Sequence, residues 1–122
     1  MSYDVRFGVE TKMPDRWGES FAVVHEPEYD SPTYNYSDMF RACMEWDYKQ
    51  GVWYPMADVI PHIEHGIHEL SFNRNEYRKY EPSNGWGTID GALKCLRNWL
   101  SELGDEYGIT YTWPIETLWF RW

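Results

Sequence analysis

Residues 88–105 read TIDGALKCLRNWLSELGD, and they carry the most regular pattern in the 122-residue chain. Apolar residues recur there every three or four positions, as on one face of a helix: Ile89, Ala92, Leu93, Leu96, Trp99, Leu100 and Leu103. Thr88 is a suitable N-cap, and Asp90 falls in the first turn, where the helix dipole favours a negative charge. The stretch therefore predicts an amphipathic helix with one face in a core.

Further helices are predicted upstream of this one. Ser37 is a good N-cap for a helix that begins after it and ends near Lys49, and this helix would carry apolar residues on one face. A second helix is predicted over 55–70, and Pro61 inside it predicts either a late start or a bend. The segment FNRNEYRKY (72–80) predicts a short additional helix.

Extended segments flank the helices on both sides. YDVRFGVE (3–10) alternates apolar with polar residues, and SFAVVHE (20–26) is a second strand candidate, so the two predict a hairpin with a long connection. The tail predicts two short strands, at 109–113 and 117–122, with Pro114 between them.

The order of strands, then helices, then strands predicts a single α+β domain over residues 1–122. A small antiparallel sheet from the N- and C-terminal strands would pack against about three to four helices. Residues 1–33 form the N-terminal strand and loop region of this domain, 34–108 the helical segment, and 109–122 the C-terminal strands.

The charge of the chain narrows the class of partner. Acidic residues outnumber lysine and arginine by 20 to 11, which gives a net charge of −9. Phosphate backbones repel such a chain, so direct nucleic-acid binding is not expected. Basic protein surfaces attract it, including those that hold nucleic acid. The alternative is that the charge serves solubility alone.

Aromatic residues make up 19% of the chain, and we expect some of them to remain on the surface, where aromatic side chains favour interfaces. Glu26, Glu28 and Asp30 occupy alternate positions, so in an extended segment they would project on one side about 7 Å apart, like successive phosphates. The alternative is a solvated loop. The predicted partner-binding residues combine this row with two rings near the C-terminus: Glu26, Glu28, Asp30, Trp119 and Trp122.

The two cysteines, Cys43 and Cys95, fall in predicted helices near apolar faces. Buried free thiols in a reducing compartment are therefore expected, with a bridge between them as the alternative. The N-terminal segment lacks the apolar core of a signal peptide, and no stretch has the length of a membrane span. The prediction is a cytosolic protein without a membrane partner or a cofactor.

Histidines repeat at helical spacing in HIEHGIHEL (62–70). His62, His65 and His68 are three residues apart, and such spacing brings imidazoles together around zinc in some helices. The H-E-x-x-H order of a zinc hydrolase is absent, and His65 and His68 fall opposite the apolar stripe. A polar helix face is the favoured interpretation, and a metal site is the alternative.

A basic group interleaved with aromatic residues precedes the motif PSNGWGTIDGAL (82–93). Together with a tryptophan of that motif, such residues would grip a phosphate and stack a base. The alternative is that the basic residues pair with neighbouring glutamates and that the tryptophan covers the first turn of the next helix. The candidate ligand-binding residues are Arg74, Tyr77, Arg78, Lys79 and Trp86.

Three stretches carry a family resemblance: YNYSDMF (34–40), EYRKYEPSNGWG (76–87) and GALKCLRNWL (91–100). The chain resembles, over a little more than half of its length, a set of small proteins encoded by phages, prophages and other mobile elements. It departs from that set in an added N-terminal region and a longer, tryptophan-rich tail. The resemblance implies a viral or mobile-element origin and a location in the host cytoplasm, and it brings no catalytic residues.

The chain lacks a Ser/His/Asp set, a P-loop and a dinucleotide-binding motif. Together with the charge and the surplus rings, this favours a non-enzymatic binding protein. The leading hypothesis is an anti-CRISPR-like inhibitor of a host or defence factor, whose partner is a basic nucleic-acid-binding protein. One alternative is a sponge for a nucleotide signal at the basic group, and another is a metal-dependent hydrolase at the histidines.

Overall fold

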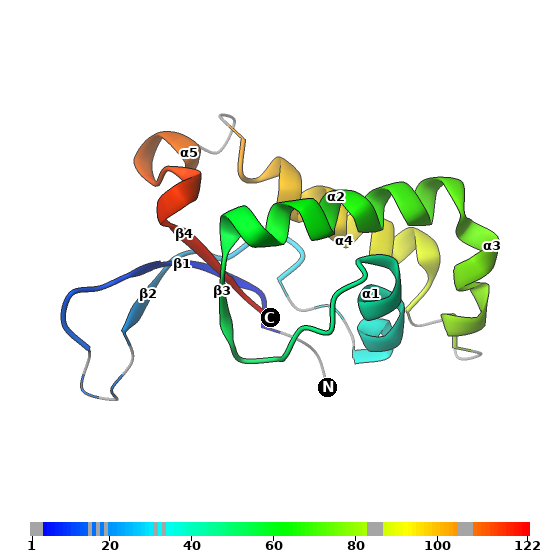
Figure 1. Cartoon of the computed structure of the whole chain (residues 1–122), viewed down its shortest axis with the longest axis horizontal. Coiled ribbons are helices and arrows are strands. Elements are labelled where there is room, and N and C mark those ends of the chain that lie inside the picture. Colours follow the sequence, from blue (N-terminus) through cyan, green and yellow to red (C-terminus); the bar gives the residue numbers. More distant parts are fainter. Residues whose placement is uncertain are drawn as a thin grey trace.

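The computed structural model describes residues 4–14, 16, 18, 20–30, 32, 34–82, 87–104 and 109–122. A small sheet lies at one end of the molecule, and the long helix α2 (Met56–Phe72) extends away from it beside α4 (Ile89–Ser101) (Figure 1). The predicted α+β fold is therefore confirmed, with the first and last strands of the chain in one sheet.

The sheet is antiparallel throughout and has four strands. They are β1 (Arg6–Glu10), β2 (Phe21–His25), β3 (Trp53–Pro55) and β4 (Leu118–Arg121), in the order β2-β1-β4-β3. The predicted hairpin of β1 and β2 is confirmed, and β1 also pairs along its other side with β4, near the C-terminus. The N- and C-terminal strands thus form the centre of the sheet.

Alternation along the central strands gives the sheet two different faces. Phe7, Leu118 and Phe120 point into the core, where each is at most 1% exposed. This inner face is packed against the helices, as α2 contacts β3 and β4. The outer face carries the intervening residues, among them Gly8 and Trp119, which lie opposite each other in the register of β1 and β4.

The helices are short apart from α2 and α4. Those two pack against each other, and α1 (Ser37–Cys43) packs on α2. A Cβ at Gly66 of α2 would lie 2.8 Å from Cγ of Met44 and 2.9 Å from Cδ1 of Leu96, so the glycine permits the close approach of the helices. The remaining helical elements are η1 (Tyr34–Tyr36), α3 (Arg74–Tyr77), η2 (Arg78–Tyr80), α5 (Ile109–Thr112) and η4 (Ile115–Thr117).

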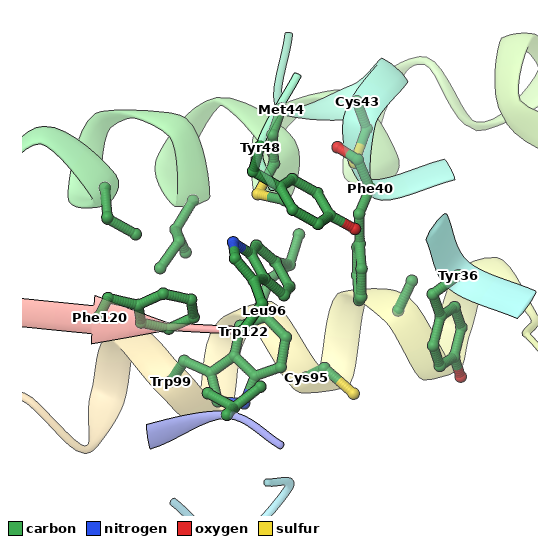
Figure 2. Packing of buried hydrophobic residues seen from close by; sticks show 14 of the residues in the cluster. Tyr36, Phe40, Cys43, Met44, Tyr48, Cys95, Leu96, Trp99, Phe120 and Trp122 are labelled. Atoms are coloured by element: carbon green, nitrogen blue, oxygen red, sulfur yellow. The ribbon is translucent and has the colours of Figure 1, made fainter. Parts of the chain in front are cut away.

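An aromatic cluster fills the core between the sheet and the helices (Figure 2). Trp122 stacks on Tyr48 with 4.1 Å between the ring centroids, and it meets the edge of Trp99 from α4 at 5.3 Å. Phe40 of α1 and Phe120 of β4 also contact Trp122. Because such rings bury large areas, this cluster ties the C-terminal strand to both the helices and the loop after α1.

The helix boundaries correct several predictions. Helix α1 begins at Ser37 itself, with Tyr36 as the N-cap residue, and it ends at Cys43 instead of near Lys49. The chain leaves the helix there because Glu45 adopts a left-handed φ of 49°. Helix α2 begins at Met56 and continues through Pro61, so a late start is wrong. Helix α4 begins at Ile89 after a Thr88 cap, as predicted.

Two extended segments were predicted wrongly. The run at 109–113 forms helix α5, in which Ile109 is buried and accepts a 2.6 Å hydrogen bond from the amide of Trp113. Its alternation suits a strand, but the segment closes a helical turn through the bond from Trp113 to Ile109 instead of pairing in the four-stranded sheet. The three-residue strand β3 was not predicted, since it is too short to show a period.

Candidate functional site

The outer face of the sheet carries a row of rings, defined here as the outer aromatic cluster: Phe21, Trp53 and Trp119. Phe21 belongs to the edge strand β2 and Trp53 to the opposite edge strand β3, yet their rings stack with centroids 5.1 Å apart. The edge of Trp119 from β4 meets Phe21 at 4.9 Å. The cluster therefore spans the sheet on its outer face.

Gly8 makes this arrangement sterically allowed. A Cβ at this position would lie 2.6 Å from Cη2 of Trp53 and 2.9 Å from the backbone oxygen of Ala22. The indole of Trp53 thus lies directly over β1, where any side chain would displace it. The guanidinium of Arg121 lies over the same indole, 5.1 Å from the ring centroid, and adds a cation–π contact.

A groove of about 580 Å³ adjoins the cluster at Trp119. We call it the Trp113–Trp119 groove. Its lining residues come from the end of β1, from the last residue of α5 and the segment that follows it, and from β4: Val9, Glu10, Thr112, Trp113, Pro114, Glu116, Thr117 and Trp119. This volume is in the range that accepts a ligand larger than one side chain.

Local hydrogen bonds hold the wall of the groove. The amide of Trp113 donates to the backbone oxygen of Ile109, which closes the turn of α5. The amide and the hydroxyl of Thr117 both donate to the backbone oxygen of Pro114, at 2.8 and 2.7 Å. These bonds fix the short helix η4 and direct the chain into β4, so Trp113 and Trp119 are held on the same depression.

The groove combines apolar walls with negative charge. Two indoles and Pro114 supply flat surfaces, while Glu10 and Glu116 are exposed and place carboxylates at the same depression. None of the described residues that line it is lysine, arginine or histidine. Such a surface favours a ligand with a cationic group and a flat or apolar part.

The predicted acidic row has a different role in the structure. The segment is not extended, because Glu28 and Tyr29 form a turn, so the even spacing along one side is lost. Glu26 and Asp30 instead both face Arg6, at 3.3 and 3.2 Å. The prediction of a phosphate-like row is therefore wrong, since two of its three carboxylates bracket one guanidinium of β1.

The same loop is anchored to helix α4. The carboxylate of Glu102, which is only 3% exposed, lies 2.8 Å from Nε2 of His25 and accepts a 2.9 Å hydrogen bond from the amide of Glu28. Trp99 Nε1 donates to the backbone oxygen of Tyr29 at 2.9 Å. The acidic loop is thus a structural connection between the sheet and α4.

The two aromatic candidates are separated by the sheet. Trp119 lies on the outer face and lines the groove, as a binding residue must. Trp122 is only 1% exposed and belongs to the core, so its predicted place on a binding surface is wrong. The period of the strand explains this difference, because Trp122 follows Leu118 and Phe120 on the inner face.

The basic group borders a second groove, of about 390 Å³, lined by Ser71, Phe72, Asn73, Arg74, Asn75, Glu76 and Arg78. Arg74 is already paired with Asp90 at 2.6 Å, and Arg78 interacts with Asn75 at 2.9 Å and with Glu81 at 3.7 Å. The predicted pairing with a neighbouring glutamate is therefore confirmed for Arg78, whereas Arg74 pairs with an aspartate of α4.

The other members of the basic group do not converge on this groove. Tyr77 is 7% exposed and belongs to the core. Lys79 lies over the ring of Tyr80, 5.3 Å from its centroid. Trp86 lies outside the described residues.

The three histidines of α2 face different neighbours. His62 stacks on Trp46 at 4.8 Å, and its Nδ1 lies 2.9 Å from the backbone oxygen of Met44. His65 approaches Glu45 and Glu69, whereas His68 is exposed beside Phe72. Within the described ranges, no group of three or more His, Cys, Asp or Glu is placed to hold a metal ion. The metal-site alternative therefore lacks a ligand set in this part of the chain.

Both cysteines are buried free thiols, as predicted. Desolvation raises the pKa of Cys43 to about 12 and that of Cys95 to about 11, which keeps both thiols protonated at neutral pH. Neither residue lines one of the two grooves described above. They serve as packing residues of the core.

Comparison of the chain with protein-family models, with curated proteins and with solved structures finds no match. Among the described residues, no helix is both long and apolar enough to cross a membrane.

Sequence reasoning missed most of the residues that line the Trp113–Trp119 groove. Trp113, Glu10 and Glu116 were not singled out, although the alternation of residues 3–10 places Gly8 and Glu10 on the face opposite Phe7. That alternation was the available signal for an outer face. The meeting of β1 with the segment before β4 depends on tertiary pairing, which no local pattern shows.

Proposed function

We propose that this protein is a non-enzymatic binding protein that occupies the nucleic-acid-binding surface of a basic host protein and thereby inhibits it. The observation that carries the proposal is the Trp113–Trp119 groove, which is lined by two half-buried indoles and two exposed carboxylates and by no described lysine, arginine or histidine. The net charge of −9 supports the same class of partner, because long-range attraction would steer a basic surface toward it.

The groove replaces the acidic loop as the proposed contact surface. Glu26 and Asp30 are engaged by Arg6, whereas Glu10 and Glu116 have no ion pair among the described contacts. Trp119 joins the groove to the outer aromatic cluster, so a partner would meet rings and carboxylates together. Because the chain resembles proteins of phages and mobile elements, we propose that its partner is a host factor in the host cytoplasm.

The test is capture followed by inhibition. The tagged chain is incubated with bacterial lysate, and captured proteins are identified, purified and assayed for nucleic-acid binding with and without the chain. We expect a basic protein whose nucleic-acid binding falls as the chain is added, and whose capture is lost with Glu10→Gln plus Glu116→Gln. Capture that is equal for wild type and this variant, or a captured protein whose nucleic-acid binding is unchanged, would contradict the proposal.

A second candidate function is the binding of a small anion at the groove of α3. The observation that favours it is the presence of Arg74 and Arg78 in one groove with Phe72, which is 76% exposed. An anion there must compete with Asp90 for Arg74, which weakens this candidate. A nucleotide panel tests it by thermal shift, because a ligand at 100 times its Kd stabilises by about 2.7 kcal/mol. No shift with any nucleotide would remove it.

A further inference from the structure

We propose that the Trp113–Trp119 groove receives an arginine side chain from an extended segment of the partner. This inference rests on the proposed function and names the chemistry that the groove recognises. The groove contains flat indole surfaces and exposed carboxylates, which are the two kinds of group that a guanidinium engages at once. Stacking on a ring and a bidentate bond to a carboxylate use different parts of that planar cation.

Lysine satisfies the same groove less well. Its ammonium is a compact and strongly hydrated point charge, so it gains from Glu10 and Glu116 but has no flat face to lay on Trp113 or Trp119. An acidic segment is repelled by both carboxylates. A neutral segment makes only the apolar contacts. Among the common side chains, arginine therefore matches the whole lining.

The protein itself contains guanidinium groups that lie over aromatic rings. Arg121 lies over the indole of Trp53 on the same face of the sheet, and Arg41 lies 4.4 Å from the centroid of the Tyr48 ring while it also faces Asp47 at 3.7 Å. The second case joins a ring, a guanidinium and a carboxylate, which is the combination proposed for the groove. The groove supplies the ring and the carboxylate, and the partner would supply the cation.

The size of the groove argues for a segment and not a free amino acid. The groove has a volume of about 580 Å³, and its lining includes residues of β1, η4 and β4. Segments of this kind dock by their backbone along a groove and place alternate side chains in it, as extended peptides do in aromatic-lined grooves. A peptide in which arginine alternates with glycine is therefore a suitable probe.

The experiment is a titration followed by the indole N–H signals in a ¹H–¹⁵N NMR spectrum. The chain has eight tryptophans, and Trp113→Phe and Trp119→Phe assign the two signals of the groove. Three nine-residue peptides are compared, in which glycine alternates with arginine, with lysine or with citrulline. Variant folding is checked by thermal unfolding. The control for Glu10→Gln plus Glu116→Gln is Asp58→Asn plus Glu64→Gln on α2, since both pairs remove two exposed carboxylates and neither control residue lines a groove described above.

We expect the signals of Trp113 and Trp119 to shift with the arginine peptide, while those of the buried Trp99 and Trp122 stay in place. The arginine peptide should bind at least about fivefold more tightly than the lysine peptide, and the citrulline peptide should not bind. Loss of the groove carboxylates should weaken arginine binding by about tenfold or more at low salt, against less than about twofold for the control pair.

Equal affinities for arginine and lysine, an absence of binding, or shifts confined to other tryptophans would overturn the inference. Shifts of the same two signals with protein concentration alone would mean that a second copy fills the groove, and they would overturn it too. These outcomes are separable from failure of the proposed function. If a host protein is captured through Glu10 and Glu116 while the arginine and lysine peptides bind equally, the proposed function stands and only the preference for arginine is rejected.

Discussion

The indole of Trp53 lies across Gly8 on the outer face of the sheet, so close that a Cβ on the glycine would be 2.6 Å from the ring. Through this contact, a residue of one edge strand reaches Phe21 on the other edge strand. Phe21 then contacts Trp119, which lines the groove. The glycine is therefore linked to the proposed binding surface through three packed rings.

Gly8→Ala should destabilise the protein by about 1–3 kcal/mol, the usual cost of forcing an additional carbon into a packed site. Both Trp53 and the backbone oxygen of Ala22 would have to move. Urea unfolding measures the effect. In a Trp53→Leu background the same change should cost at least about 0.5 kcal/mol less, because part of the clash is gone. Equal costs in both backgrounds would show that the ring does not set the constraint.

Glu102→Ala should destabilise the protein by about 1.5–3 kcal/mol, because it removes a buried charged acceptor. His25 and the amide of Glu28 both lose their partner, and the loop loses two of its connections to α4. Urea unfolding gives the free energy, and hydrogen exchange at the amide of Glu28 should accelerate. Ser101→Ala, at an exposed neighbouring position, is the control. Unchanged exchange at Glu28 would argue against the anchor.

Alkaline pH should destabilise the native state, because the core holds two buried thiols. Desolvation raises the pKa of Cys43 to about 12 and that of Cys95 to about 11, from an ordinary 9.0. Between pH 9.0 and the raised pKa of each thiol, the unfolded chain has released a proton that the native state still holds. The free energy of unfolding therefore falls as pH rises. The stabilisation is complete below pH 9 and is lost as pH passes through 11 and 12.

Each buried thiol should contribute a slope of about 1.4 kcal/mol per pH unit within its window. Tyr36 and Tyr77, whose pKa desolvation raises from 10.0 to about 12, add to the slope above pH 10. Urea unfolding at several values between pH 7 and pH 10.5 tests this, and Cys95→Ala should reduce the slope. An identical slope in Cys95→Ala and wild type would show that this thiol is not protonated by burial.

The sequence predicts those elements whose period extends over enough residues. The helix after Thr88 and the strand at 3–10 have such periods, and both were located correctly. The run at 109–113 alternates like a strand, yet Ile109–Thr112 is helical, because a local preference for a strand needs a pairing partner and this segment has none in the four-stranded sheet. Strand β3 exists only through its pairing with β4, which is a tertiary contact.

The candidate site was less predictable than the fold, for the same physical reason. Glu10 and Glu116 are more than one hundred positions apart, and the pairing of β1 with β4 brings their elements together. The partners of the acidic loop were equally hidden, since Arg6 is 24 positions before Asp30. In contrast, the inward position of Trp122 follows from its phase with Leu118 and Phe120, which the sequence already contains.

The most direct test of the central claim is the affinity of a purified captured partner for two double variants of equal charge. Glu10→Gln plus Glu116→Gln removes the carboxylates of the groove, and Asp58→Asn plus Glu64→Gln removes two exposed carboxylates from α2. If the groove is the binding surface, isothermal titration calorimetry should show a loss of about tenfold or more for the first pair and less than about twofold for the second. Equal losses for the two pairs would mean that net charge alone drives binding, and would contradict the account.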